Sequence, residues 1–323
     1  MRNGKNLILY LGRKGGGLQL FNEIELLTNE TGTLSIGPTV FPESANTYST
    51  NWNRTALLIP ISSLYAAAVI VKERKNFNRL VIPMTSWADL LPSAISLLLR
   101  KEVSRVIHDL SIHPGDSKHQ VMPLRMQILL STNLMTLSNY VATGLSKITE
   151  KSVKNIGMFF PRRIPTSRPR IEMQIIFFGR LSKYKGADLF LETLHGSKNG
   201  LKIVIAGQGE IPAQLKAMAV THINRYVSEE ELIDLLCESD IAIFPYIEGS
   251  QSGAMAFAAT YGCKIVGTNV GGISEFGTGR NGFWFSSPDA NSLRRTLQKA
   301  IASKDRPVIS DETRAQFFLA MGI

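Results

Sequence analysis

Short apolar segments typical of β-strands alternate with segments of helical periodicity along most of the chain. This alternation predicts parallel sheets, because parallel neighbours need a crossover connection and a helix usually supplies it. In the first half the expected strands are 6–12, 33–38, 79–84, 102–110 and 134–139, with helical patterns at 18–30 and 87–101. In the second half the expected strands are 172–179, 201–207, 240–246 and 264–269, and the helices 185–196, 228–239, 253–262 and 292–301.

The length of 323 residues favours two such α/β domains, since single cores stop growing at roughly 250–300 residues. The segment FFPRRIPTSRPRIE (159–172) has three prolines, four arginines and no periodicity, which is typical of a linker. We therefore expect an N-terminal domain over 1–160, a linker over 161–171 and a C-terminal domain over 172–305. A C-terminal helical segment over 306–323 is expected to pack back on the N-terminal domain.

The charge is concentrated in the first half. The chain carries a net +10; residues 1–160 contribute 17 Lys+Arg against 10 Asp+Glu, or +7, which leaves +3 for residues 161–323. A basic domain suggests an anionic partner, namely nucleic acid, an acidic lipid surface or a phosphorylated substrate, and plain solubility is the alternative. Since no cluster of basic and aromatic residues is evident, no nucleic-acid partner is expected.

Composition argues against a disulfide framework, a metal centre and a membrane span. Cys237 and Cys263 lie far apart in apolar surroundings and are expected to be buried free thiols, and the five histidines lack ligand spacing. The N-terminus does not resemble a signal peptide. The longest apolar run (55–71) is interrupted by Pro60 and is too short for a span, so it predicts a turn and a buried helix. We expect a cytoplasmic protein, at most peripheral to a membrane.

Several candidate ligand loops follow strands, where doubly wound folds bind their ligands. The glycines of LGRKGGGLQLF (15–17) allow backbone approach to a phosphate or sugar, or form a flexible turn. After Gly179, Arg180 and Lys185 flank a loop leading into a helix, which suits a diphosphate because arginine gives a forked contact and lysine a point charge. The alternative is two solvated surface cations.

Two further loops have the same position. The strand ending at Gly207 is followed by Tyr226 and Val227, against which a flat base could lie; a tyrosine packed in the turn is the alternative. Glu248 comes just past a predicted buried strand, and SQSG (250–253) supplies backbone amides at a helix start. A carboxylate there can accept hydrogen bonds from two sugar hydroxyls, or it is a simple helix cap.

The motifs FGRLSKYKG, IAGQGE, RYVSEEELIDLLCESDIAIFPY, EGSQSG and KIVGTNVGGISEF together resemble the carboxyl half of the retaining glycosyltransferases of family 4, over about 178–285. The likeness is looser in the first half, in GGG, VIHDLSIHPGD (106–116) and LMTLSNYVATGL (134–145). It implies the GT-B fold, in which two facing Rossmann-like, doubly wound parallel-sheet domains border a cleft. The second domain of that fold holds most of the nucleotide sugar donor.

The resemblance also implies roles for individual residues. Arg180 and Lys185 would bind the donor diphosphate, and Glu248 the donor sugar hydroxyls. His108 would face the reacting centre and orient the donor sugar, with a core histidine at a strand end as the alternative. The remaining donor-site positions are Gly16, Gly17, Gly179, Gly207, Tyr226, Val227, Ser250, Gln251, Ser252 and Gly253.

One position departs from the family pattern. In the family pattern, seven residues separate the glutamate that corresponds to Glu248 from a second glutamate that holds the ribose. The second position is Ala256 in this chain, and similar members that contain SQSG also lack the second acid. Other groups then bind the ribose, or donor affinity is weaker, or activity is lost. The resemblance implies a retaining transferase that needs neither metal nor cofactor and moves sugar to a glycan or lipid-linked acceptor in bacterial surface polysaccharide synthesis (O-antigen, capsule or exopolysaccharide). A catalytically degenerate subunit that binds or stabilises a partner is the alternative.

Overall fold

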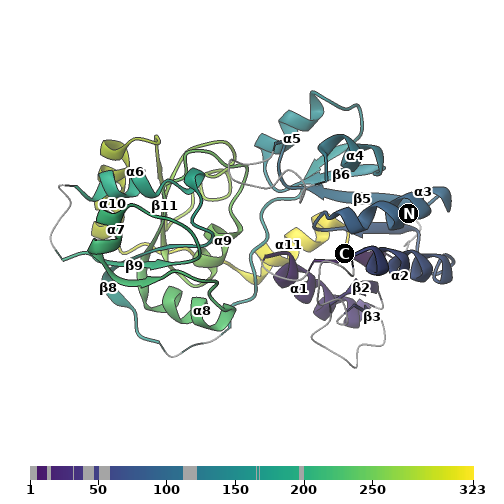
Figure 1. The fold of residues 1–323 in the computed structure, drawn as a ribbon, viewed down its shortest axis with the longest axis horizontal. Helices are drawn as coiled ribbons and strands as arrows, with labels where there is room; N and C mark the ends of the chain where they lie inside the picture. Colours follow the sequence, from purple (N-terminus) through teal and green to yellow (C-terminus); the bar gives the residue numbers. More distant parts are fainter. Residues whose placement is uncertain are drawn as a thin grey trace. The chain divides into compact units, whose positions relative to one another are not determined.

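The computed structural model describes residues 6–12, 16–31, 33–38, 47–50, 59–111, 122–164, 166, 168–195 and 200–323. These residues form two compact units (Figure 1). Unit 1 holds the described residues of Met1–Ile112, Asp116–Gly157 and Gln316–Ile323, and unit 2 holds those of Met158–Ala315. Each unit has its own parallel sheet with helices, so the predicted α/β class is confirmed.

The sheet of unit 1 has the order β3-β2-β1-β4-β5-β6-β7, with every pair parallel. The order reverses between β1 and β4, and ligands of doubly wound sheets bind at the carboxyl ends beside such a point. The strands are β1 Asn6–Leu9, β2 Leu34–Gly37, β3 Thr47–Ser49, β4 Arg79–Ile82, β5 Glu102–Ile107, β6 Asn133–Thr136 and β7 Val153–Asn155. All five strands predicted for this half are present.

Helices pack on this sheet through aliphatic side chains of the crossover segments, including Val69 and Ile70, which are buried against the strands. The chain returns to unit 1 at its end, where Arg79 donates to the carbonyl of Met321 (2.6 Å) and Lys154 to that of Ala320 (2.7 Å). The helices are α1 Gly16–Thr31, α2 Ile59–Lys72, η2 (3-10) Trp87–Asp89, α3 Leu90–Leu98, α4 Leu124–Leu129 and α5 Asn139–Ser146. The final helix, α11 Asp311–Met321, belongs to unit 1 from Gln316 onward.

A buried ion pair lies inside unit 1. Asp89 and Arg105 are both fully buried, with a guanidinium nitrogen 3.5 Å from the carboxylate. Arg105 also donates to the hydroxyls of Ser93 (2.7 Å) and Ser131 (3.1 Å), while the backbone N–H of Ser86 donates to Asp89 (2.6 Å). Burial raises the pKa of Asp89 to about 6, and Arg105 and Ser86 act in the opposite direction. This network joins η2 and α3 to the strand β5.

The sheet of unit 2 has the order β10-β9-β8-β11-β12-β13, again with parallel pairs. In the numbering of the unit this is the 3-2-1-4-5-6 order of the Rossmann fold, and its reversal lies between β8 and β11. The strands are β8 Ile171–Phe178, β9 Lys202–Ala206, β10 Ala219–Ile223, β11 Ser239–Phe244, β12 Lys264–Thr268 and β13 Phe283–Ser286. The four strands predicted here are confirmed.

Hydroxyl and carboxylate caps begin the helices of unit 2 where the sequence suggests. Ser228 accepts from the N–H of Glu231 (3.2 Å), and the Glu231 carboxylate pairs with Arg225. Asp289 likewise accepts from the N–H of Ser292 (2.9 Å). The helices are η3 (3-10) Lys183–Lys185, α6 Ala187–Leu194, α7 Ala213–Met218, α8 Glu229–Glu238, α9 Gly253–Thr260 and α10 Ala290–Ala302.

Two linker arginines are held by unit 2. Arg168 pairs with Asp234 (3.0 Å) and Glu238 (3.3 Å), and Arg170 donates to backbone carbonyls, including that of Tyr261 (2.8 Å). Cys237 and Cys263 are free and buried, as predicted. Within the described ranges, no helix has both the length and the apolar character required to cross a bilayer.

Candidate functional site

The predicted loops of unit 2 meet at the reversal of its strand order. The chain leaves β8 through Gly179 and Arg180, and leaves the neighbouring β11 through Pro245 and Tyr246. Both exits lie at the carboxyl edge of the sheet, because the strands are parallel. This edge is where a doubly wound sheet binds its ligand.

Glycines let these loops approach one another closely. Gly186 has a φ of +75°, and a Cβ there would lie 1.8 Å from the carbonyl oxygen of Pro245. The N–H of Ile247 donates to the carbonyl of Tyr184 (2.9 Å), so the loop after β8 is bonded to the exit of β11. At Gly207, with a φ of +148°, a Cβ would lie 1.8 Å from the carbonyl oxygen of Gly179. No other residue can occupy either position without moving the backbone.

The ammonium of Lys185 lies between two tyrosine side chains of these loops. Its ammonium donates to the hydroxyl of Tyr246 and lies 4.0 Å from the centre of that ring and 5.3 Å from the ring of Tyr184. Burial lowers the pKa of Lys185; Tyr184 raises it, and the charge of Arg180 lowers it further. Arg180 itself is exposed. The pair is therefore two neighbouring cations, one partly buried and one exposed, rather than two solvated surface cations.

The hydroxyl of Tyr246 also contacts the residue that caps α9. The Tyr246 hydroxyl lies 3.2 Å from Oγ of Ser252, which caps α9 by accepting from the N–H of Met255 (3.2 Å). Ser250 and Ser252 are buried, whereas Gly253, the first residue of the helix, is exposed. A helix start favours negative charge, and here a lysine is held beside it. Together they can bind an anion such as a diphosphate.

Tyr246 is the residue that sequence reasoning missed. It is 1% exposed, and burial raises the pKa of its hydroxyl. In the sequence it is one aromatic residue after an apolar strand, and only its position directly before Ile247 and Glu248 could have drawn attention to it. Glu248 and Gln251 are partly exposed in the loop between Tyr246 and α9.

Tyr246→Phe tests this connection, because it keeps the ring beneath Lys185 and removes only the hydroxyl. A hydrogen bond to a charged group contributes roughly 1.5–3 kcal/mol, so we expect a roughly tenfold or greater loss of affinity for a nucleoside diphosphate. Calorimetric titration with the nucleoside diphosphate measures this affinity. The matched control is Tyr261→Phe, which removes a hydroxyl that accepts from the N–H of Ile164 (3.2 Å). Equal affinities in both variants would show that Tyr246 has no part in binding.

The loop before α8 presents a tyrosine to solvent. Tyr226 is 61% exposed, so the alternative of a tyrosine packed in the turn is wrong. Arg225 holds this loop, since its guanidinium makes two 2.7 Å bonds to the Glu231 carboxylate and a third, of 3.2 Å, to the Tyr226 carbonyl. The turn after β9 lies next to it, because the N–H of Gly207 donates to the carbonyl of Ile223 (2.9 Å). The ring of Tyr226 and the adjoining Val227 offer a surface for a flat base.

The predicted site residues of unit 1 lie at the carboxyl edge of the sheet of that unit. His108 follows β5, and its Nε2 lies 3.0 Å from the carbonyl oxygen of Pro83, which follows β4. Because a carbonyl only accepts, Nε2 carries the hydrogen of this bond. His108 is only partly buried, and Gly16 and Gly17 form the first turn of α1. Their approach to a donor stays a prediction, and residues 13–15 and 112–116 of the same motifs lie outside the described residues.

Ala256 is fully buried in α9. Its N–H donates to the carbonyl of Ser252 (3.1 Å), and its own carbonyl accepts from the hydroxyl of Thr260 (3.1 Å). A glutamate at this position would need to bury its carboxylate or displace its neighbours. No described group of three or more His, Cys, Asp or Glu side chains is placed to hold a metal ion.

We expect Ala256→Glu to lower the free energy of unfolding by about 2–4 kcal/mol without raising nucleotide affinity, because it overpacks the core and buries a charge. Thermal unfolding with and without nucleotide measures both effects. Ala254→Glu is the matched control, since Ala254 lies in the same helix and is partly exposed. An Ala256→Glu variant as stable as the wild type, with tighter nucleotide binding, would instead identify position 256 as a lost ribose contact.

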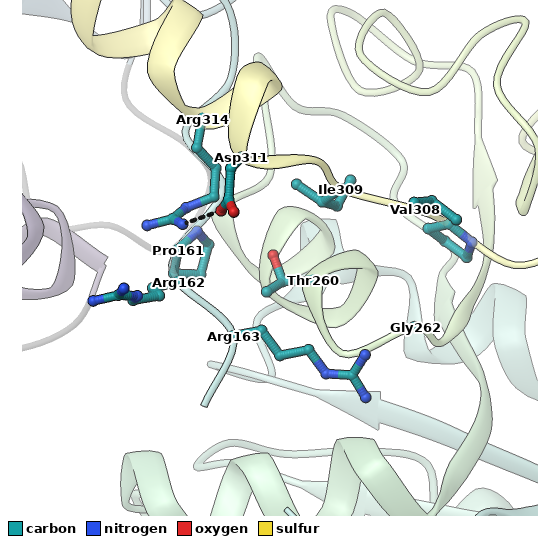
Figure 2. A pocket seen from close by; sticks show the side chains of 10 residues that line it. Pro161, Arg162, Arg163, Thr260, Gly262, Val308, Ile309, Asp311 and Arg314 are labelled. Carbon is teal, nitrogen blue, oxygen red and sulfur yellow. Dashed lines mark hydrogen bonds and ion pairs between the residues drawn. The ribbon is translucent and has the colours of Figure 1, made fainter. Parts of the chain in front are cut away.

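A separate pocket of about 360 Å³ lies in unit 2 between the linker, the end of α9 and residues 307–314 (Figure 2). Thr260 and Gly262 line it, as does Arg314, which pairs with Asp311 (2.9 Å). The eight residues of α9 separate Thr260 from Ser252 by roughly 12 Å. None of the predicted site residues lines this pocket.

Comparison with known proteins supports the sequence resemblance over unit 2. Residues 172–303 match the family model described as "Glycosyl transferases group 1". The matched segment contains every predicted site residue from Gly179 to Gly253. No curated protein matches the chain.

Solved structures match almost the whole chain at low identity. Anabaena HepE in complex with UDP and glucose is 15% identical, with a TM-score of 0.66, covering 99% of this chain and 94% of that chain. A glycosyltransferase from Rickettsia africae is 16% identical, with a TM-score of 0.63 and coverage of 100% and 93%. A sucrose-phosphate synthase from Thermosynechococcus elongatus is 12% identical, with a TM-score of 0.62 and coverage of 98% and 93%. These likenesses confirm the GT-B fold class.

Proposed function

We propose that the chain is a glycosyltransferase that moves a sugar from a nucleotide diphosphate sugar to a glycan or lipid-linked acceptor. The observation that carries the proposal is Lys185, held by Tyr246 beside the Ser252-capped start of α9, at the strand-order reversal of unit 2. A family match over 172–303 supports it. HepE has been solved with UDP and with UDP-glucose, which makes uridine nucleotides the first ligands to try.

In this proposal, different residues bind the diphosphate, the sugar and the base of the donor. Lys185, Arg180 and the amides at the start of α9 bind the diphosphate and stabilise its charge as it departs. Glu248 accepts hydrogen bonds from the sugar hydroxyls, and the base lies against Tyr226 and Val227. Gly179 and Gly207 keep the backbone close at the two strand exits. From unit 1, Gly16 and Gly17 approach the diphosphate or sugar, and His108 orients the sugar.

We propose transfer with retention of configuration. The bond between the anomeric carbon and the diphosphate oxygen breaks while the acceptor oxygen bonds to the same face of that carbon. The acceptor proton passes to the departing phosphate oxygen, so no separate carboxylate base is required. In this scheme the side-chain cations and backbone dipoles, rather than a metal ion, offset the charge of the leaving group.

The acceptor side of the proposal rests on the basic first half of the chain. A charge of +7 over 1–160 suits an acceptor that carries phosphate, or an anionic membrane that holds it. We therefore place the protein in the cytoplasm, peripheral to the inner face of the cell membrane, in the synthesis of a bacterial surface polysaccharide.

A thermal-shift screen against UDP, GDP, ADP and their sugars tests the donor assignment. A ligand that binds only the folded state raises the unfolding temperature, so one base should do so in both its diphosphate and sugar forms. The release of nucleoside diphosphate in the presence of candidate acceptors then tests transfer. If none of the nucleotides raises the unfolding temperature at millimolar concentration, the donor assignment is wrong.

A second candidate function is a catalytically degenerate subunit that binds or stabilises an active partner. It is favoured by Ala256, which is buried where the resembling family has its ribose-binding acid. This function predicts stabilisation by a nucleotide with neither transfer nor hydrolysis of any nucleotide sugar. Turnover with any donor would exclude it.

A further inference from the structure

The outer face of α2 in unit 1 is apolar and exposed. Ile61, Leu64 and Val71 are 50%, 61% and 42% exposed, and Ala68 between them is exposed as well. Their spacing of three, four and three residues puts them in one stripe. The sequence predicted a buried helix here; the helix is confirmed, but it buries only its opposite face, against the sheet. A surface helix normally carries charged residues on its outer face, and this one has none before Lys72.

Neighbouring elements extend this stripe. Ser63 of α2 donates to the carbonyl of Ala88 (2.7 Å), which places the exposed Trp87 beside the helix. The helix α3 packs along α2, as Figure 1 shows, and ends at Leu98, which is 82% exposed. We call Ile61, Leu64, Val71, Trp87 and Leu98 the α2 surface. Scattered exposed aliphatic residues are ordinary, but a gathered set marks a binding surface.

The exposed charges between residues 60 and 101, which include the α2 surface, are all basic. Over residues 60–101 the only acids are Glu73 and Asp89. Both are buried, Glu73 against Tyr48 and Asn76 and Asp89 against Arg105. The exposed charged residues of this range are Lys72, Arg74, Lys75 and Arg100.

Lys72 ends α2, and the other three basic residues come from two loops that lie together. Lys101 donates to the carbonyl of Phe77 (2.7 Å), which joins the loop after α3 to the loop after α2 at the amino edge of the sheet. An exposed acid, Glu102, follows at the start of β5. The α2 surface is thus apolar along its length and basic at one end.

We propose that the α2 surface docks on an anionic lipid bilayer. In this arrangement α2 lies in the plane of the membrane, its aliphatic side chains and Trp87 enter the boundary between headgroups and acyl chains, and the basic loops contact anionic headgroups. The inference deepens the peripheral membrane association proposed above and does not depend on the donor site.

Charge decides between a bilayer and a second copy of the chain. A two-fold dimer whose axis passes near the basic end of this surface would place Lys72, Arg74, Lys75 and Arg100 of both copies against each other. Lysine is also depleted in protein interfaces, whereas it is common where helices lie on anionic membranes. The excess of exposed basic residues at this end of the surface therefore favours lipid.

Flotation of the full chain with vesicles tests the proposal. We expect binding to vesicles of equal parts phosphatidylglycerol and phosphatidylcholine and much weaker binding to phosphatidylcholine alone. The double variant Leu64→Ser/Leu98→Ser should bind the anionic vesicles at least about tenfold more weakly, since burying a leucine contributes roughly 1.5–3 kcal/mol. The matched control is Val220→Ser/Val308→Ser, in unit 2, where these residues are 64% and 86% exposed.

Other outcomes overturn the inference. The inference is wrong if the wild-type protein does not bind anionic vesicles. It is also wrong if the double variant floats with them as the wild type does. A dimer that depends on Leu64 and Leu98 in gel filtration would assign the surface to a second copy. Thermal unfolding, with and without the stabilising nucleotide, is measured on every variant. A normal nucleotide response with failed flotation overturns the lipid inference alone and leaves the proposed transferase function standing.

Discussion

Replacing Lys185 with alanine is expected to lower the rate of sugar transfer about 100-fold or more, the scale found when one preorganised transition-state donor is removed. The reason is its position: the ammonium is partly buried between Tyr184 and Tyr246, next to the start of α9. A charge in such surroundings acts more strongly on a departing diphosphate than a solvated one. Arg180→Ala should have a similar effect, because we propose that this second cation binds the same diphosphate.

Steady-state rates with the best nucleotide sugar from the screen measure this effect. Lys183→Ala is the matched control, since Lys183 is an exposed lysine of the same 3-10 helix and its loss should leave the rate nearly unchanged. A drop in kcat would assign Lys185 to the departing diphosphate, and a rise in KM alone would assign it to ground-state binding. Unchanged turnover in both Arg180→Ala and Lys185→Ala would disprove the diphosphate assignment.

Replacing Arg105 with leucine is expected to lower the free energy of unfolding by about 3–5 kcal/mol, because it leaves the carboxylate of Asp89 buried without a cation. Arg105 is fully buried, and its bonds to Ser93 and Ser131 are lost as well. Urea unfolding of the full chain near neutral pH measures the change. Lys75→Ala, which removes an exposed cation of the same unit, is the control and should be nearly neutral.

The pH dependence identifies the cause. Burial raises the pKa of Asp89 to about 6 in the folded state, above its ordinary value of 3.8, so folding takes up a proton between about pH 4 and 6. The contribution of Asp89 to stability therefore falls as the pH rises through that window. Without Arg105 the pKa rises further, so the loss of stability in Arg105→Leu should shrink at pH 5. A loss that is the same at pH 5 and pH 7.5 would attribute it to packing alone.

The sequence predicts the inner strands of both sheets and misses the edges. The strands of the described chain that were not predicted are β3, β7, β10 and β13, and each lies at an edge of its sheet. An inner strand of a parallel sheet is covered on both faces and reads as a continuous apolar run, whereas these edge strands are short and partly exposed. The strands β3 (TYS) and β7 (VKN) lack an apolar run, while β13 (FWFS) is apolar but only four residues long. The strand order itself follows from pairing between distant segments, which local patterns do not encode.

In the candidate site, too, the sequence predicts some features and misses others. Strand ends and glycines place Arg180, Lys185 and Ser252 at one edge from the sequence alone, because parallel strands end together. The hydroxyl of Tyr246 between Lys185 and Ser252 depends on which way side chains turn, and that is set by tertiary packing. The burial of Ala256 and the exposure of Leu64 have the same origin, since each depends on what packs against one helix face.

The central claim is that unit 2 binds a nucleoside diphosphate at the exits of β8 and β11. Amide hydrogen exchange of the full chain, with and without the nucleotide that stabilises it, tests this claim most directly. We predict slower exchange in residues 179–186 and 248–255, and unchanged exchange around the separate pocket at 307–314. Protection confined to 307–314, or no protection by UDP, GDP or ADP in either segment, would contradict the account.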